Sequence, residues 1–513
     1  MRIGLAFLAA LAAFSQPASA EWLQAKSRHF TIYSDTSRPA VEELARRLES
    51  VDGALRYISG IPDSEDAAAN PVTVYVVDDL SAIRRLAKRN DIAGFYIPRA
   101  DGAVAFTPRR GDGVGLGALN PQIVLFHEYA HHFLLGNSAA AYPAWLSEGY
   151  AEFVSTAKID DRGVLIGGAA QHRAYGLYAS MDLPLATLFA SGPRASALER
   201  DQVYSRGWLL THYLLLNAER RPQLGRYLTA VNSGTPALKA ATDAFGDLRA
   251  LDRSLDAYLK QRTLSGLMIG KDKLKPVTVA VRPLTPGERA LVDMRMVSTK
   301  GVDQKTATAL YARALKAAAS HPTDPVAQGW LAEMAYDADR DDEAEAATDR
   351  ALAADPKSVQ ALLYKGRVHL RRARTAGARD PKIWSEARSW IVKANRVDPN
   401  NAAALQLFHQ SFEMADAKPA KSAAAGVHRA LELAPQDPGL RFRSARQHLA
   451  DGELAEAKRA LRPLAFNPHA GPDNPAAKLI ALIDAGTTAT AAMQALEAQE
   501  KGAADKATTG GTD

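Results

Sequence analysis

A chain of 513 residues with 47% hydrophobic and 23% charged residues is long enough for two or three domains and can bury a sizeable core. It contains no cysteine, which excludes disulfides, a thiol nucleophile, thiolate zinc ligands and a lipid-anchored cysteine. The net charge of +6 is spread along the chain without a basic block carrying interleaved aromatics, so we expect no nucleic-acid partner.

The first twenty residues have the pattern of a cleaved signal peptide. Arg2 precedes an apolar run from Ile3 to Phe14, and Ala18-Ser19-Ala20 offers a small-residue cleavage site. The run is too short to span a bilayer, and no later stretch approaches the length of a transmembrane helix. We therefore expect a soluble mature chain that begins at Glu21, has no transmembrane segment and is secreted. A bacterial periplasm is the preferred compartment, and an extracellular fate stays open.

Residues 21–265 mix strand and helix patterns and predict an α+β domain. Strand patterns rich in β-branched or apolar residues cover 29–34, 72–77, 93–97 and 103–107, and helical periodicity covers 41–58. The last two strands are joined through Arg99-Ala100-Asp101-Gly102, which indicates a hairpin. After Ala118 the pattern is mostly helical, apart from a second hairpin around 160–166.

The C-terminal half has the pattern of a helical repeat. The stretch from Lys271 to Pro286 is rich in Lys, Val and Pro, and residues 266–300 are expected to be a linker. Over 301–485, helical segments end at Pro322, Pro356, Pro399, Pro435 and Pro468, close to the spacing of tetratricopeptide repeats. We expect an all-α repeat domain there. Residues 486–513 should form a helical end and a tail that is disordered from Lys501.

One motif in the N-terminal half points to metal chemistry. His127-Glu128-Tyr129-Ala130-His131 is an HExxH sequence, preceded by Asn120 as a good N-cap and Pro121 as a first helical residue. Residues four apart share a helix face, so both imidazoles can bind one ion while Glu128 holds a water beside it. Two helix histidines without a metal are the alternative. His132 points about 100° away and is expected to be a packing or surface residue.

A zinc site also needs a third protein ligand and an open position for water. The metzincin solution, a histidine six residues after His131, is excluded because Asn137 stands there. Pro143 begins a second helical pattern, in which Glu148 and Glu152 lie four apart on one face. Taken alone, such a pair of glutamates more often belongs to a solvated helix surface.

The run Trp145-Leu146-Ser147-Glu148-Gly149-Tyr150-Ala151 resembles the gluzincin metallopeptidases, the class of thermolysin and the zinc aminopeptidases. In that class a Trp-Leu-x-Glu-Gly-x-Ala helix supplies the third ligand. The resemblance implies that His127, His131 and Glu148 hold one zinc ion per chain, and that Glu152 orients a ligand histidine. The chain is most similar to the peptidase-MA-like gluzincins of bacteria, joined to tetratricopeptide-type repeats. This implies a zincin-like N-terminal domain with a small mixed sheet plus helices.

A further stretch, Tyr204 to Leu214, is similar to the Tyr-x-x-Gly helix of zinc aminopeptidases. The resemblance implies that the Tyr204 hydroxyl steadies the oxyanion of a tetrahedral intermediate; a tyrosine packed against the core is the alternative. Zinc would lower the pKa of its water, and Glu128 would accept the proton and pass it to the leaving nitrogen. We therefore expect a zinc-dependent peptidase.

The aminopeptidase motif Gly-x-Met-Glu-Asn, which captures a free amine, is absent. The strand before the active helix, Gly102-Ala103-Val104-Ala105-Phe106, carries no acid for this role. We therefore expect endopeptidase-like action on a peptide or protein that pairs with this strand by β-addition.

A second class of function is also compatible with the sequence. The repeats could bind a peptide or protein partner in their groove, with the N-terminal domain as a degenerate remnant. The complete set of His127, Glu128, His131, Glu148 and Tyr204 argues against decay.

Overall fold

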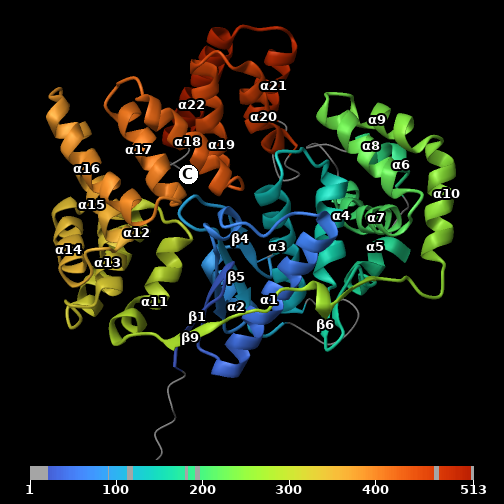
Figure 1. The fold of residues 1–513 in the computed structure, drawn as a ribbon, viewed down its shortest axis with the longest axis horizontal. Helices are drawn as coiled ribbons and strands as arrows, with labels where there is room; N and C mark the ends of the chain where they lie inside the picture. The colour runs from blue at the N-terminus through green and yellow to red at the C-terminus, as the bar shows by residue number, and fades with distance from the viewer. Residues whose placement is uncertain are drawn as a thin grey trace, which may run out of the picture.

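The computed structural model describes residues 21–90, 92–111, 120–178, 183–190, 197–466 and 473–509. Within these ranges the chain is mostly helical, with a small mixed sheet in the N-terminal half and paired helices in the C-terminal half (Figure 1). The signal peptide expected over 1–20 lies outside the described residues. Among these described residues, no helix is both long enough and apolar enough to span a bilayer.

The larger sheet has six strands in the order β4-β5-β3-β2-β1-β9. They are β1 (Leu23–Lys26), β2 (Phe30–Ser34), β3 (Val72–Val77), β4 (Phe95–Ile97), β5 (Val104–Pro108) and β9 (Ala280–Pro283). The central strands β2, β3 and β5 are parallel, whereas β1, β4 and β9 pair antiparallel with their neighbours. The strands predicted at 29–34, 72–77, 93–97 and 103–107 correspond to β2, β3, β4 and β5.

Helices surround this sheet in the N-terminal half. Those described there are α1 (Arg38–Ser59), α2 (Leu80–Ala87), α3 (Pro121–Asn137), α4 (Ala144–Ser155), α5 (Ala174–Tyr178), α6 (Leu185–Ala190), α7 (Ala197–Leu216), α8 (Arg221–Asn232), α9 (Ala237–Phe245) and α10 (Leu248–Leu259). The short segment η2 (Gln171–Arg173) leads into α5. In Figure 1, α4 to α10 form the lobe to the right of the sheet.

The two faces of the sheet pack against different parts of the chain, because successive strand residues point to opposite sides. Ile32 and Val74 belong to the core that the sheet shares with α1 and α3. Their neighbours Tyr33 and Tyr75 stack on the other face, with ring centroids 5.1 Å apart, and Phe106 continues the stack at 5.3 Å. The metal-motif helix and the aromatic stack therefore lie on opposite faces.

Residues 266–300 are not the linker that composition predicted. The strand β8 (Leu267–Gly270) completes a second sheet with β6 (Lys158–Asp160) and β7 (Gly163–Ile166). The strand β9 pairs with β1, and the helix α11 (Pro286–Thr299) joins the core of the aromatic face. Composition missed these strands because their partners lie far away in the sequence.

The C-terminal half consists of helices that pack in consecutive pairs. They are α12 (Gln304–Ala318), α13 (Pro325–Asp337), α14 (Asp341–Ala354), α15 (Val359–Thr375), α16 (Pro381–Val397), α17 (Ala402–Met414), α18 (Lys421–Leu433), α19 (Pro438–Ala450), α20 (Leu454–Ala465), α21 (Pro475–Asp484) and α22 (Ala489–Thr509). Pro322, Pro356, Pro399 and Pro435 lie between helices, as the repeat pattern predicts, and Pro468 lies outside the described residues. The tail expected to be disordered from Lys501 continues α22 to Thr509.

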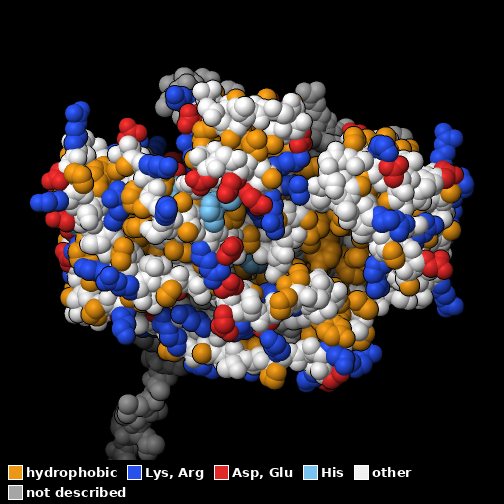
Figure 2. Space-filling view, turned by 45° about the horizontal axis from the view of Figure 1, so that its top comes forward, with side chains coloured by type: hydrophobic (Ala, Val, Ile, Leu, Met, Phe, Trp, Pro, Cys, Tyr) orange, Lys and Arg blue, Asp and Glu red, His pale blue; other side chains and the backbone are white. Residues whose placement is uncertain are grey.

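The paired helices form an arc around the N-terminal sheet (Figure 1). At its start, Trp330 of α13 meets the ring of Tyr33 edge-on, with centroids 6.3 Å apart. Further along, α17, α18 and α19 share an apolar cluster with Ala100 of the β4–β5 turn. On the face shown in Figure 2, Lys and Arg side chains are interspersed with Asp and Glu.

Candidate metal centre

The helix α3 begins as its sequence predicts. The side chain of Asn120 accepts a hydrogen bond of 2.9 Å from the backbone two residues on, and Pro121 lies in the first turn. This cap fixes the start of the helix and hence the direction in which its side chains point. His127 and His131, four residues apart, project from the same face.

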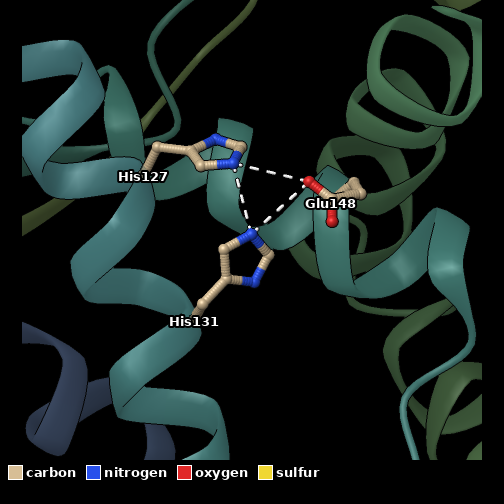
Figure 3. A group of neighbouring side chains, drawn as sticks. All are labelled: His127, His131 and Glu148. Atoms are coloured by element: carbon tan, nitrogen blue, oxygen red, sulfur yellow. Dashed lines mark hydrogen bonds and ion pairs between the residues drawn. The ribbon is translucent and has the colours of Figure 1, made fainter. Parts of the chain in front are cut away.

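These two imidazoles meet a carboxylate from α4 (Figure 3). Oε2 of Glu148 lies 3.4 Å from Nε2 of His127 and 3.4 Å from Nε2 of His131, and the two nitrogens are 3.2 Å apart. Ligand atoms bound at about 2.0–2.2 Å in a tetrahedral arrangement are about 3.3–3.6 Å from one another. The separations of 3.2 and 3.4 Å lie within about 0.1 Å of this range, so the three atoms can surround a tetrahedrally coordinated ion. Two imidazoles with one carboxylate suit zinc.

A close crossing of α4 and α7 brings Glu148 to this position. A Cβ atom on Gly149 would lie 2.3 Å from the carbonyl oxygen of Gly207, and one on Gly207 would lie 2.6 Å from that of Trp145. Only glycine at both positions allows the two backbones to approach so closely. The crossing places Glu148 and Tyr204, which neighbour these glycines, on the same side of the two helices.

Glu152, one turn after Glu148, is the centre of a buried polar network. Its Oε1 lies 3.2 Å from Nδ1 of His127 and also pairs with Arg173, while its Oε2 lies 2.5 Å from Nε2 of His172. Although burial opposes ionisation of Glu152, the hydrogen bonds to His127 and His172 hold its pKa well below the usual value. Glu152 therefore stays a carboxylate and can orient His127, the role that the resemblance implied.

The same network makes the site electronegative. Burial disfavours the imidazolium of His127, but the hydrogen bonds to Glu148 and Glu152 outweigh it and raise the pKa of His127 to about 10. The raised pKa of His127 means that the nearby carboxylates of Glu148 and Glu152 stabilise a positive charge at this position. A bound divalent cation can supply that positive charge.

His172 and Arg173 are functional candidates that sequence reasoning did not single out. They follow Glu152 by 20 and 21 residues and lie on η2, beyond a hairpin. No spacing rule links a helix to a segment that folds back onto it after a turn. The sequence offered one indication of their role, namely two basic residues that follow the helix of Glu148 and Glu152 within about 20 residues.

Tyr204 and Glu128 both lie near His127. The Tyr204 ring stacks near that of His127, with centroids 6.2 Å apart and planes inclined by 22°, and the Arg173 guanidinium lies 4.7 Å from the Tyr204 ring centre. Burial raises the pKa of Tyr204, so its hydroxyl keeps the proton at neutral pH. Glu128 lines a cavity of about 190 Å³ that also includes His127 and the segment before β4.

The strand predicted to bind substrate cannot do so by β-addition. In β5, Val104 pairs with Thr73 of β3 on one side and with Ile97 of β4 on the other, and Ala105 and Phe106 are likewise paired on both sides. Gly102 and Ala103 precede the strand, and the carbonyl of Ala103 accepts a hydrogen bond of 2.8 Å from Thr73. Among the described residues, the outermost strand at this end of the sheet is β4.

A second group of possible ligand atoms, in His29, Glu49 and Asp52, lines a cavity of about 780 Å³. Here the carboxylate oxygens already have protein donors: Glu49 accepts from the backbone and ring of His29 at 2.7 and 2.8 Å. Asp52 accepts from Tyr129 at 2.6 Å and from Arg56 at 2.7 Å. A guanidinium inside the group would repel a metal ion, so this is a buried ion network.

No protein-family model matches the chain, and no curated protein matches it. Among solved structures, the crystal structure of a thermophilic TPR protein from Thermus thermophilus is 21% identical over 38% of this chain and 97% of that chain, with a TM-score of 0.31.

Proposed function

We propose that the chain is a zinc-dependent peptidase. The observation that supports this best is the triangle of donor atoms from His127, His131 and Glu148, with sides of 3.2, 3.4 and 3.4 Å. A set of two imidazoles and one carboxylate leaves a position for water and retains positive charge on the ion. When bound, zinc supplies a Lewis acid that makes water a nucleophile near neutral pH.

The residues around the triangle have distinct roles in peptide hydrolysis. Glu152 accepts a hydrogen bond from Nδ1–H of His127, which fixes the tautomer that would present the Nε2 lone pair to the ion. The Glu128 carboxylate accepts a proton from the attacking water and delivers it to the leaving nitrogen. The Tyr204 hydroxyl donates a hydrogen bond to the carbonyl oxygen as negative charge develops there.

The substrate is proposed to be an extended peptide that pairs with β4 instead of β5. The segment just before β4, with Ala93 and Gly94, lines the same cavity as Glu128 and His127. A peptide added along β4 would pass across this cavity, with its backbone held by the strand. Nothing in this arrangement requires a free N-terminus, so we favour endopeptidase-like action.

Metal analysis together with a single substitution tests the proposal. Purified protein should contain about one zinc per chain, and Glu128→Gln should keep the metal while peptide cleavage falls by about 100-fold or more. The matched control is Glu43→Gln, which makes the same change on the exposed surface of α1. A wild-type protein that binds no zinc would rule out this function.

A non-catalytic scaffold is the second candidate. The observation in its favour is the array of helix pairs from α12 to α22, a type of structure that commonly binds peptides or proteins. In this case Glu128→Gln should support the protein's physiological role as well as the wild type does. Loss of function in Glu128→Gln would instead favour the peptidase.

A further inference from the structure

The helix α19 touches the N-terminal domain at its first turn. Asp437 divides its carboxylate between two donors: Oδ1 accepts from the backbone of Leu440 at 3.0 Å and so caps α19. Oδ2 accepts from the backbone N–H of Ala100 in the β4–β5 turn at 2.7 Å. One side chain thus ties the start of a repeat helix to the turn that follows β4.

The β4–β5 turn is also enclosed by apolar side chains of the repeats. Ala100 is only 7% exposed. It belongs to a cluster with Ala402, Val427, Ala430, Leu433, Ala434 and Leu440. Within the N-terminal domain, Asn70 donates a hydrogen bond of 3.1 Å to the carbonyl of Arg99, and this bond holds the turn in place.

One turn further along α19, a second contact reaches the metal-motif helix. Arg441, which is 2% exposed, donates to the carbonyl oxygens of Leu135 at 3.2 Å and Ser138 at 3.4 Å. These groups belong to the C-terminal end of α3, where carbonyls lack partners within the helix and the helix dipole is negative. Burial lowers the pKa of Arg441 to about 10, so it is still charged at neutral pH.

Between these two contacts, β4 and α3 lie directly against each other. A Cβ atom on Gly94 would lie 2.7 Å from the Val124 side chain of α3, so the chain leading into β4 has no space to move closer. The Tyr96 hydroxyl in β4 lies 2.6 Å from Nδ1 of His132. His132 therefore joins the strand to the helix, so that of the two roles expected for it, packing or surface, it has the packing role.

We propose that α19 is a brace that sets the separation between the edge strand β4 and the helix α3. Asp437 holds the strand through its turn, and Arg441 holds the end of the helix. Since Ala93, Gly94 and Val124 all line the cavity beside Glu128, the brace fixes the width of the proposed substrate channel. The description of the cavity as a substrate channel rests on the proposed peptidase function, whereas the brace itself does not.

The test uses Asp437→Ser in the full chain. Serine caps a helix about as well as aspartate, but its shorter side chain cannot cap α19 and also reach Ala100. Asp380→Ser is the matched control, because Asp380 caps α16 through the backbone of Lys382 and is exposed. Arg441→Lys tests the contact with the end of α3, because lysine keeps the positive charge but lacks the guanidinium that donates to the carbonyls of both Leu135 and Ser138.

Hydrogen exchange measured by mass spectrometry should show the effect locally. In Asp437→Ser, amides of β4 should exchange about tenfold faster than in the wild type, the effect of losing one hydrogen bond to a charged group. In Arg441→Lys the acceleration should appear at residues 133–138, and Asp380→Ser should leave both segments unchanged. With a peptide substrate, Asp437→Ser should raise KM several-fold with kcat unchanged.

Unchanged exchange of β4 in Asp437→Ser would overturn the brace, as would equal acceleration along the whole chain. An unchanged KM alongside faster exchange would show that β4 does not set the substrate channel. Faster local exchange in a protein that neither binds zinc nor cleaves peptides would refute the proposed function and leave the brace intact.

Discussion

Replacing Gly149 with alanine should separate α4 from α7 and weaken zinc binding. The new Cβ would lie 2.3 Å from the Gly207 carbonyl oxygen and 2.5 Å from Oγ1 of Thr211. Because ordinary carbon-to-oxygen contacts are about 3.3 Å or longer, the helices must move apart by about 1 Å. Glu148 precedes Gly149, so its carboxylate moves with the helix, whereas metal–ligand distances tolerate only about 0.2 Å.

We expect the zinc affinity of Gly149→Ala to fall by about 10- to 100-fold, the range typical of disturbed support around a metal ligand. Overpacking should also lower the free energy of unfolding by about 1–3 kcal/mol. Competition with a chromogenic chelator measures the affinity, and urea unfolding measures the stability. Gly225→Ala is the control, because a Cβ there meets nothing within 4 Å. Wild-type zinc affinity in Gly149→Ala would refute the role assigned to this helix crossing.

Three further substitutions address individual side chains. Glu152→Gln should weaken zinc binding by about 10- to 100-fold in the same chelator assay, because the amide orients His127 less firmly. Tyr204→Phe should lower kcat for a peptide by about 100-fold with little change in KM or zinc content, as steady-state kinetics can measure. The buried pair of His29 and Glu49 raises the pKa of His29 above 6.5 against the opposing effect of burial. The contribution of this pair to the free energy of unfolding should therefore be complete below pH 6.5 and fall as the pH rises through the pKa of His29 in the folded protein. Urea unfolding measured from pH 6 to 9 should show this decrease, and His29→Gln should remove the pH dependence.

Local sequence signals were enough for the parts of the site that lie on single helices. Asn120 and Pro121 define the start of α3, and the spacing of His127 and His131 defines their common face. The strands were also recognisable from their own residues. Each of these features depends on neighbours within about one or two helical turns, which is the range over which sequence patterns carry structural information.

Features that depend on topology were not accessible in the same way. The β-branched pattern of β5 is compatible with an edge or a central strand, and only the order of strands decides which. The predicted role of Gly102 to Phe106 as a docking strand failed for that reason. In the same way, nothing near Asp437 in the sequence reveals that its second carboxylate oxygen binds Ala100, a residue 337 positions earlier.

The aromatic face of the sheet bears on the choice between an enzyme and a scaffold. Tyr33, Tyr75 and Phe106 would be more exposed if the C-terminal half were an independent arm, because α11 and α13 are among the elements that bury them. Burying large aromatic side chains stabilises a fold by several kcal/mol in all, so the two halves should fold as one unit. The repeats contact the sheet through Trp330 and the end of α3 through Arg441. These contacts predict a structural role for the repeats beside the proposed site.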